Sequence, residues 1–219
     1  MERVLEPEVM DTWEESVEYD AMDFDEVNTA FAERAIALGP ASGLIWDAGT
    51  GTARIPILLC QRQPQWRITA TDLSKNMLMI GEKNVEQAGL QAQITLEYVD
   101  AKRLPYPNQQ FDMVISNSLV HHLPDPLPFL QELKRVLKPG GAVLLRDLIR
   151  PDDETVTEAL VSSIGTEYND HQRQLFRDSL GAAFRLDEIR ELLQQAGLAD
   201  VQVYQSSDRH WTAERTYHL

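Results

Sequence analysis

The feature that most constrains the fold of this chain is a regular alternation of strand-like and helix-like segments, which begins at Leu44. The strand-like runs are short and apolar or β-branched, and they read LIWDA, RITATD, ITLEYVD, FDMVISN and AVLLRDL. Helical periodicity fills the segments between them. Strands that alternate with helices form a parallel sheet covered by helices on both faces. The sequence therefore predicts a doubly wound α/β fold.

Three segments depart from this alternation. Residues 201–217 contain two further strand-like runs, VQVYQSS and RHWTAERTY, which we expect to form a C-terminal hairpin. Residues 150–184 have helical character and contain no strand-like run. Residues 1–43 are acidic and include a helical period over Asp25–Leu38. We therefore predict one domain over residues 44–219, with residues 1–43 as an N-terminal helical lid and a helical insertion at 150–184.

Composition limits the classes of function. The formal net charge is −15, and the one cluster of basic residues, Lys134, Arg135 and Lys138, is typical of a solvated helix face. Such a surface disfavours nucleic acid as a partner. Neither an apolar run near the ~18 residues of a membrane span nor a signal peptide is evident. The single cysteine, Cys60, lies in an apolar run and fits a buried residue in a reducing, cytoplasmic compartment.

The turn after the first strand carries the strongest chemical signal. It places Asp47 at the strand end and the small residues Gly49, Gly51 and Ala53 at every second position. Glycine lets the backbone approach a ligand closely, and the acid favours a ligand that carries positive charge. A nicotinamide dinucleotide would need G-x-G-x-x-G, whereas Arg54 occupies the third position here. The turn therefore favours a cationic cofactor such as S-adenosylmethionine over a nicotinamide cofactor.

Acidic residues follow three successive strands. Asp47, Asp72 and Asp100 each lie at or just after a strand end, and in an open parallel sheet these ends line one ligand crevice. Asp72 occupies the position from which an acid accepts both ribose hydroxyls. Asp100 can accept a hydrogen bond from an adenine amine. The alternative role for such acids is to cap the following helices.

At this point the chain resembles the class I S-adenosylmethionine-dependent methyltransferases. The resemblance covers residues 44–149 and rests on WDAGTGTA, TDLSKNML, VDAKRLPYPNQQFDMVIS, NSLVHHLPD and LKPGG. It is greatest with the small-molecule branch that includes the ubiquinone- and menaquinone-biosynthesis methyltransferases. It implies a Rossmann-like, doubly wound, seven-stranded and mainly parallel sheet with a C-terminal antiparallel hairpin. Ala53 stands where the family often has glycine.

The resemblance also implies which residues contact S-adenosylmethionine and its product S-adenosylhomocysteine. The turn after the first strand holds the methionine part, the second strand end holds the ribose, and the third meets the adenine. The loop after the fourth strand closes over the methionine part, and a tyrosine of the N-terminal segment covers it. The expected contacts are Tyr19, Asp47, Ala48, Gly49, Thr50, Gly51, Asp72, Leu73, Met77, Asp100, Ala101, Asn117 and Ser118.

Candidate catalytic and acceptor-binding residues follow the fourth and fifth strands. His121 and His122 lie beside the expected position of the transferred methyl group and could act as a general base. Packing against a helix and capping of the loop are their structural alternatives. His171 in the insertion is a second candidate base, or an exposed helix residue. Arg146 and Asp147 end the fifth strand, where they contact the acceptor or form a buried pair with each other.

The sequence shows no metal site, because its histidines lack the spacing that gathers ligands. We therefore expect methyl transfer from S-adenosylmethionine to an O, N or C nucleophile of a small-molecule acceptor. Two alternatives stay open: a protein that binds the cofactor as a sensor or partner without methyl transfer, and a nicotinamide-dependent oxidoreductase. The sequence identifies neither the acceptor nor the oligomeric state.

Overall fold

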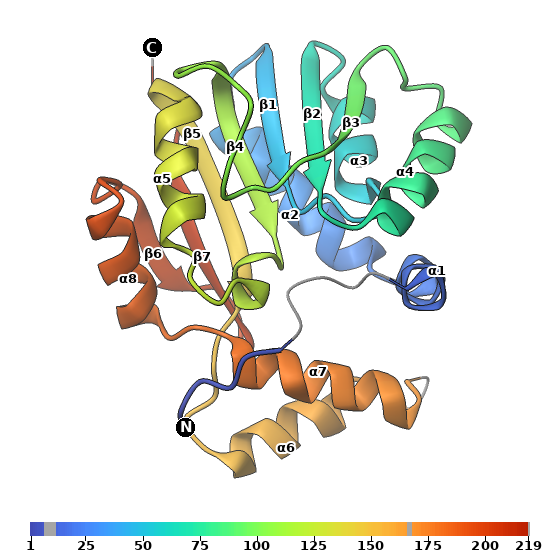
Figure 1. The fold of residues 1–219 in the computed structure, drawn as a ribbon, viewed down its shortest axis with the longest axis vertical. Helices are drawn as coiled ribbons and strands as arrows, with labels where there is room; N and C mark the ends of the chain where they lie inside the picture. The colour runs from blue at the N-terminus through green and yellow to red at the C-terminus, as the bar shows by residue number, and fades with distance from the viewer. Residues whose placement is uncertain (7–11, 166–167, 219) are drawn as a thin grey trace.

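A seven-stranded sheet forms the centre of the molecule in the computed structural model, which describes residues 1–6, 12–165 and 168–218 (Figure 1). The strand order is β3-β2-β1-β4-β5-β7-β6. The first five strands are parallel, and β7 is antiparallel to both of its neighbours. The strands are β1 (Gly43–Ala48), β2 (Trp66–Asp72), β3 (Ile94–Tyr98), β4 (Phe111–Asn117), β5 (Leu137–Leu148), β6 (Gln202–Gln205) and β7 (His210–Arg215). The predicted mainly parallel sheet with a C-terminal antiparallel hairpin is confirmed.

The direction of the chain across the sheet reverses between β1 and β4. From β1 the chain proceeds outward through β2 to β3, and it then returns to place β4 on the other side of β1. At such a switch point the connections after the two central strands diverge, which opens a crevice at their carboxyl ends. The fold therefore positions a ligand site where β1 and β4 end.

Helices cover both faces of the sheet because successive strand residues point to opposite sides. Ile45 packs into one core cluster and its neighbour Trp46 into the other, and both are fully buried. Residues of α5 and α8 complete the cluster around Trp46, and residues of α2, α3 and α4 complete the cluster around Ile45. The helices are α2 (Asp25–Leu38), α3 (Arg54–Arg62), α4 (Lys75–Gln87), α5 (Leu127–Val136) and α8 (Leu186–Gln195).

The remaining helices gather near the carboxyl edge of the sheet, toward which β1, β2 and β4 point in Figure 1. They are α1 (Trp13–Ala21), α6 (Glu154–Ser163), α7 (Asp170–Ala182) and the short 3-10 helix η1 (Val120–His122). The insertion is helical, as predicted, and its helices pack around the end of β5 through Leu148, Leu160 and Leu180. Both α1 and α7 begin with a capping box, which explains why these short polar helices start where they do.

The predicted N-terminal helical lid needs correction. Helix α2 is a layer of the core rather than a lid, because Phe31 and Ala35 are buried against α3 and the sheet. Helix α5 ends at Val136, and Leu137 pairs with Phe111 as the start of β5. Because Leu137 already pairs with β4, the helix ends before it reaches the Pro-Gly-Gly turn at residues 139–141.

Cys60 is buried in the core, as its apolar neighbours predict. Among the described residues, no helix combines the length and the apolar character needed to cross a lipid bilayer.

Candidate functional site

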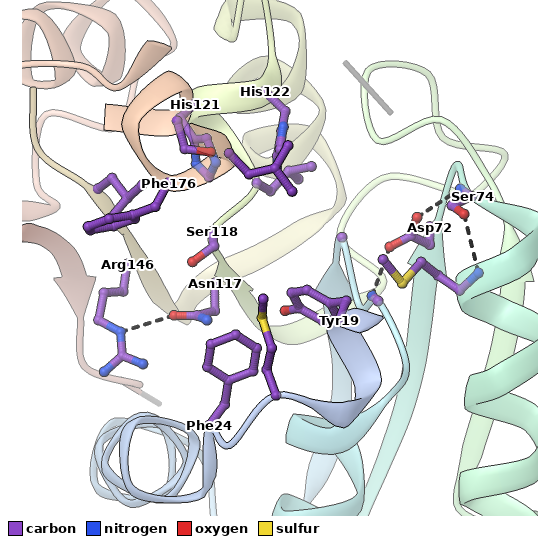
Figure 2. Close-up of a pocket in the computed structure, with 18 of the residues that line it drawn as sticks. Tyr19, Phe24, Asp72, Ser74, Asn117, Ser118, His121, His122, Arg146 and Phe176 are labelled. Atoms are coloured by element: carbon purple, nitrogen blue, oxygen red, sulfur yellow. Dashed lines mark hydrogen bonds between the residues drawn. The ribbon is translucent and has the colours of Figure 1, made fainter. Parts of the chain in front are cut away.

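A cavity of about 430 Å³ lies at the carboxyl edge of the sheet, between the strand ends and the helices that cover them (Figure 2). Most of the expected cofactor contacts line it: Tyr19, Gly49, Gly51, Asp72, Leu73, Met77, Asp100, Ala101, Asn117 and Ser118. Asp47 and Thr50 line a smaller pocket that shares Tyr19 and Gly49 with the cavity. Ala48 lines neither pocket, and its carbonyl accepts a hydrogen bond from Ser116 Oγ at 2.8 Å.

The turn after β1 is built from left-handed backbone. Gly49, Gly51 and Ala53 have φ angles of 70°, 56° and 63°, which only glycine adopts without a penalty of roughly 1 kcal/mol. A Cβ on Gly49 would lie 3.0 Å from Leu119 Cδ1, so the loop after β4 closes tightly on this residue. Both Gly49 and Thr50 donate their N–H groups to the carbonyl of Thr71 at 2.9 Å. The turn is therefore fixed against β2 before any ligand binds.

Asp47 is a buried acid that lacks a cation. It is 2% exposed, and its Oδ2 has no hydrogen-bond partner among the described residues. Burial raises the pKa of this carboxyl to about 7. A hydrogen bond from Thr50 lowers the pKa, and the negative charge of Asp72 raises it. An ammonium group beside Asp47 would supply the missing charge partner. The site thus fits the methionine part of S-adenosylmethionine on chemical grounds.

Asp72 is held in place by the backbone around it. Its Oδ2 accepts the N–H of Gly51 and its Oδ1 the N–H of Ser74, both at 2.8 Å. Burial raises the pKa of Asp72, although these hydrogen bonds oppose the shift. Ser74 caps α4 through a hydrogen bond from the N–H of Met77. The carboxylate keeps lone pairs that face the cavity and suit a pair of hydroxyl donors.

Tyr19 closes the cavity from α1. Its ring lies 5.3 Å from that of Phe24, and burial together with the charge of Asp72 raises its pKa to about 12. Arg54 anchors this helix, because its Nε lies 3.2 Å from Asp20 Oδ1. The residue that breaks the dinucleotide-binding pattern thus has a role of its own: it ties α1 to the start of α3.

His121 and Asp147 form a buried pair beneath the cavity. His121 Nδ1 lies 2.5 Å from Asp147 Oδ1, while the other carboxylate oxygen accepts the N–H of Val120. Burial alone would lower the pKa of His121 and raise that of Asp147, but their mutual attraction shifts both the opposite way. Asp147 does not line the cavity and its carboxylate is occupied by these partners, which corrects its expected place as an acceptor contact.

Glu6 joins this cluster from the N-terminal segment. Its Oε1 lies 2.9 Å from His122 Nδ1 and 3.4 Å from His121 Nε2, and its Oε2 accepts a hydrogen bond from Ser179 Oγ. Its side chain is 8% exposed, and His122 holds its pKa below the ordinary value although burial acts in the opposite sense. The sequence analysis missed Glu6, because no spacing rule connects it with residues more than a hundred positions away.

These three residues are also the one group, among the described residues, whose atoms gather as metal ligands do. Two ligands of a tetrahedral zinc ion lie about 3.3 Å apart, as bonds of about 2.0–2.1 Å require. The 2.9 Å between Glu6 and His122 is a hydrogen-bonding distance instead. Neither Glu6 Oε1 nor His122 Nδ1 meets hydrogen-bond geometry, however, so we interpret the group as an ion-pair cluster.

Arg146 lies at the other end of the cavity from Asp72 in Figure 2. Its Nε donates to Asn117 Oδ1 at 3.0 Å and its Nη2 to the carbonyl of Val27 at 2.9 Å. Burial lowers the pKa of its guanidinium to about 10. Arg146 therefore forms no pair with Asp147, which is the structural alternative that the sequence left open.

Helix α7 contributes a face that the sequence analysis did not identify. Gln172, Leu175, Phe176 and Ser179 line the cavity with helical spacing, whereas His171 lies outside this face and is exposed. The helical spacing of residues 172, 175, 176 and 179 is the feature of the sequence that could have predicted this face. His171 is thus not placed to contact a bound acceptor.

The comparisons with known proteins agree with this geometry. Residues 46–145 match a family described as a methyltransferase domain. The chain is 29% identical over 183 residues to 27-O-demethylrifamycin SV methyltransferase of Amycolatopsis mediterranei. The aligned residues cover 80% of this chain and 61% of that relative. It is 38% identical over 107 residues to demethylmenaquinone methyltransferase of Bacillus velezensis, which covers 48% and 46%. The chain thus spans less than two thirds of either relative.

The fold is shared with solved structures. A SAM-dependent methyltransferase from Aquifex aeolicus superposes with a TM-score of 0.67 at 18% sequence identity, covering 94% of this chain and 99% of that one. At this identity the likeness concerns the fold alone.

Proposed function

We propose that this chain is a class I S-adenosylmethionine-dependent methyltransferase, which transfers a methyl group from S-adenosylmethionine to an O, N or C nucleophile of a small molecule. The match of residues 46–145 to a methyltransferase domain supports this. The observation that carries this proposal is Asp47, a buried carboxyl without a cation at the switch point of the sheet. It lies beside a preformed glycine turn, and the negative charge of Asp72 acts on it. A ligand that carries an ammonium group and a ribose complements this pair of acids.

Different side chains contact different parts of the cofactor. Asp47 and the turn at Gly49–Gly51 receive the amino-acid part, and Asp72 accepts the ribose hydroxyls. Leu73 and Met77 pack against the adenine, and Asp100 accepts from its amine. When bound, the cofactor supplies an electrophilic methyl group on a sulfonium ion. The residues that hold it need only align this group with the acceptor, which accounts for much of the rate enhancement in such a displacement.

The loop after β4 fixes the geometry around the reacting groups. Ser118 has a φ of 60°, a strained value for a non-glycine residue, and its N–H donates to the carbonyl of Arg146 at 2.9 Å. Asn117 is held by Arg146 on the same side. Tyr19 of α1 and Phe176 of α7 cover this loop (Figure 2) and exclude water from it.

We assign the general base to His122 where the acceptor retains its proton at neutral pH. Both ring nitrogens of His121 face carboxylates, so His121 has no free lone pair, and His171 is remote. His122 lines the cavity and directs Nδ1 to Glu6. A carboxylate this close to Nδ1 favours the tautomer that carries its proton on Nδ1, which leaves Nε2 to accept the acceptor's proton. Glu6 acts as a positioning residue.

An activity screen with isotopically labelled methyl donor tests the proposal. The purified protein is incubated with phenols, quinone precursors and amines, and label is followed into each class. We expect incorporation into at least one class and formation of S-adenosylhomocysteine in equal amount. Binding of S-adenosylhomocysteine without any incorporation would contradict methyl transfer and favour a cofactor-binding sensor. A reducing, cytoplasmic compartment fits the buried Cys60 and belongs to the same proposal.

A further inference from the structure

We propose that the methyl acceptor carries a carboxylate on an aromatic or similarly flat apolar body, and that Arg146 binds this carboxylate. The inference rests on the proposed function and narrows its substrate class. It starts from Arg146, from the groups around it and from the apolar wall beside it.

Arg146 is a cation without an acid. Among the described residues, no carboxylate lies within ion-pair distance of its guanidinium, and its two hydrogen bonds go to the neutral oxygens of Asn117 and Val27. The group remains charged at neutral pH, since burial lowers its pKa only to about 10. A guanidinium withdrawn from water without a counter-charge is costly, and proteins normally pair it.

Some arginines of this acid-rich chain have an acid partner, and others, such as Arg3 and Arg173, donate only to backbone carbonyls of the described residues. The chain has 35 acidic and 20 basic residues, so a partner for an arginine is easily found. Several other arginines in the described part of the chain have one: Arg34 with Glu214, Arg135 with Glu132, Arg150 with Glu188, Arg177 with Glu158 and Arg215 with Asp200. Two arginines of the described residues line the cavity. Arg209 Nε lies 3.4 Å from Asp208 Oδ1, whereas Arg146 has no acid partner among those residues and lies over the ring of Phe31 at 5.0 Å, so a ligand can still supply its counter-charge.

The groups around Arg146 reinforce its preference for an anion. His210 lines the same cavity, and burial with the nearby charge of Arg146 lowers its pKa to about 4, so it is neutral near pH 7. Arg209 lies over the ring of Phe176 at 5.8 Å. Three acids in the described part of the chain line the cavity. Asp72 is at the opposite end (Figure 2), Asp100 Oδ1 lies 3.2 Å from Lys102 Nζ, and Asp23 is exposed and accepts the N–H of Asp25.

The wall beside this cationic end is apolar. Phe24, Val27, Leu148, Ile164, Leu175 and Phe176 line it. Figure 2 shows Phe24 and Phe176 on either side of the space in front of Arg146 and Asn117. Rings in this arrangement accept a flat apolar body between them. A carboxylate at one end of such a body would reach the guanidinium.

The cofactor also has a carboxylate, so the experiment must separate the two anions. Arg146→Met removes the charge and keeps much of the volume, while Arg177→Met, outside the cavity, is the matched control. Isothermal titration with S-adenosylhomocysteine comes first. We expect Arg177→Met to bind it as the unaltered protein does, and Arg146→Met to lose less than about tenfold in affinity, because it loses the hydrogen bond that holds Asn117. A tenfold loss confined to Arg146→Met would assign this arginine to the cofactor and overturn the inference.

The second titration uses pairs of probes at saturating S-adenosylhomocysteine: 4-hydroxybenzoate against 4-hydroxybenzamide, and 2-naphthoate against 2-naphthamide. The unaltered protein and Arg177→Met should prefer the acid over its amide by about tenfold in at least one pair, the range of one charged hydrogen bond. Arg146→Met should lose this preference. No acid preference in either pair, or a preference that survives in Arg146→Met, would overturn the inference. Binding of S-adenosylhomocysteine tests the proposed function independently of both results.

Discussion

Asp47 concentrates the chemistry of the site in one residue. A carboxyl with a pKa near 7 is half protonated at neutral pH, and a cationic ligand favours its ionised form. Binding of an ammonium group must therefore release a proton from Asp47. By linkage, the affinity for such a ligand rises with pH through this pKa and falls as the carboxyl becomes protonated.

We predict that S-adenosylhomocysteine binds roughly tenfold more weakly at pH 5.5 than at pH 7.5, because Asp47 must lose its proton first. Calorimetry in buffers of different ionisation enthalpy would measure the released proton directly. Asp47→Asn should bind more weakly and lose most of this pH dependence. An unchanged pH dependence in Asp47→Asn would show that another group titrates.

Segments of secondary structure bring together residues that no local pattern connects. The first six residues run across η1 and α7, where Arg3 donates to the carbonyls of His121, Leu123 and Ala182 and stacks on Phe184. Val4 donates its N–H to the carbonyl of Gly181 at 3.0 Å. These contacts fix the backbone that carries Glu6 and so deliver its carboxylate to His122.

We predict that Glu6→Gln lowers kcat by about tenfold or more and leaves the affinity for S-adenosylhomocysteine unchanged. Glu6→Asp should retain part of the activity, and Glu2→Gln, an exposed acid of the same segment, serves as the control. A loss of S-adenosylhomocysteine binding in Glu6→Gln, or no recovery of kcat in Glu6→Asp, would make Glu6 merely structural.

At the scale of the whole molecule, the sequence predicted the sheet because its signals are local. Apolar runs, the capping Ser74 and the turn at Gly49 and Gly51 each reflect the conformation of a few neighbouring residues. The acids at the strand ends followed from topology, since parallel strands place their carboxyl ends at one edge.

The rest depends on contacts between distant segments. Phe24 and His210 reach the cavity, and Glu6 reaches His122, only through tertiary packing. Helix α2 is a core layer because it packs against α3. The same packing separates Arg146 from Asp147, whose side chains leave opposite faces of β5. Single-sequence patterns describe elements well and their assembly poorly.

The central claim is that the cavity binds S-adenosylmethionine through Asp72 and the turn beside it, and one titration tests it most directly. S-Adenosylhomocysteine and NAD are titrated calorimetrically into the unaltered protein and into Asp72→Ala, with the fold of the variant checked by its melting temperature. We predict binding of S-adenosylhomocysteine but not of NAD, and a loss of affinity of about tenfold or more in a folded Asp72→Ala. Tight binding of NAD without S-adenosylhomocysteine, or undiminished affinity in Asp72→Ala, would contradict the account.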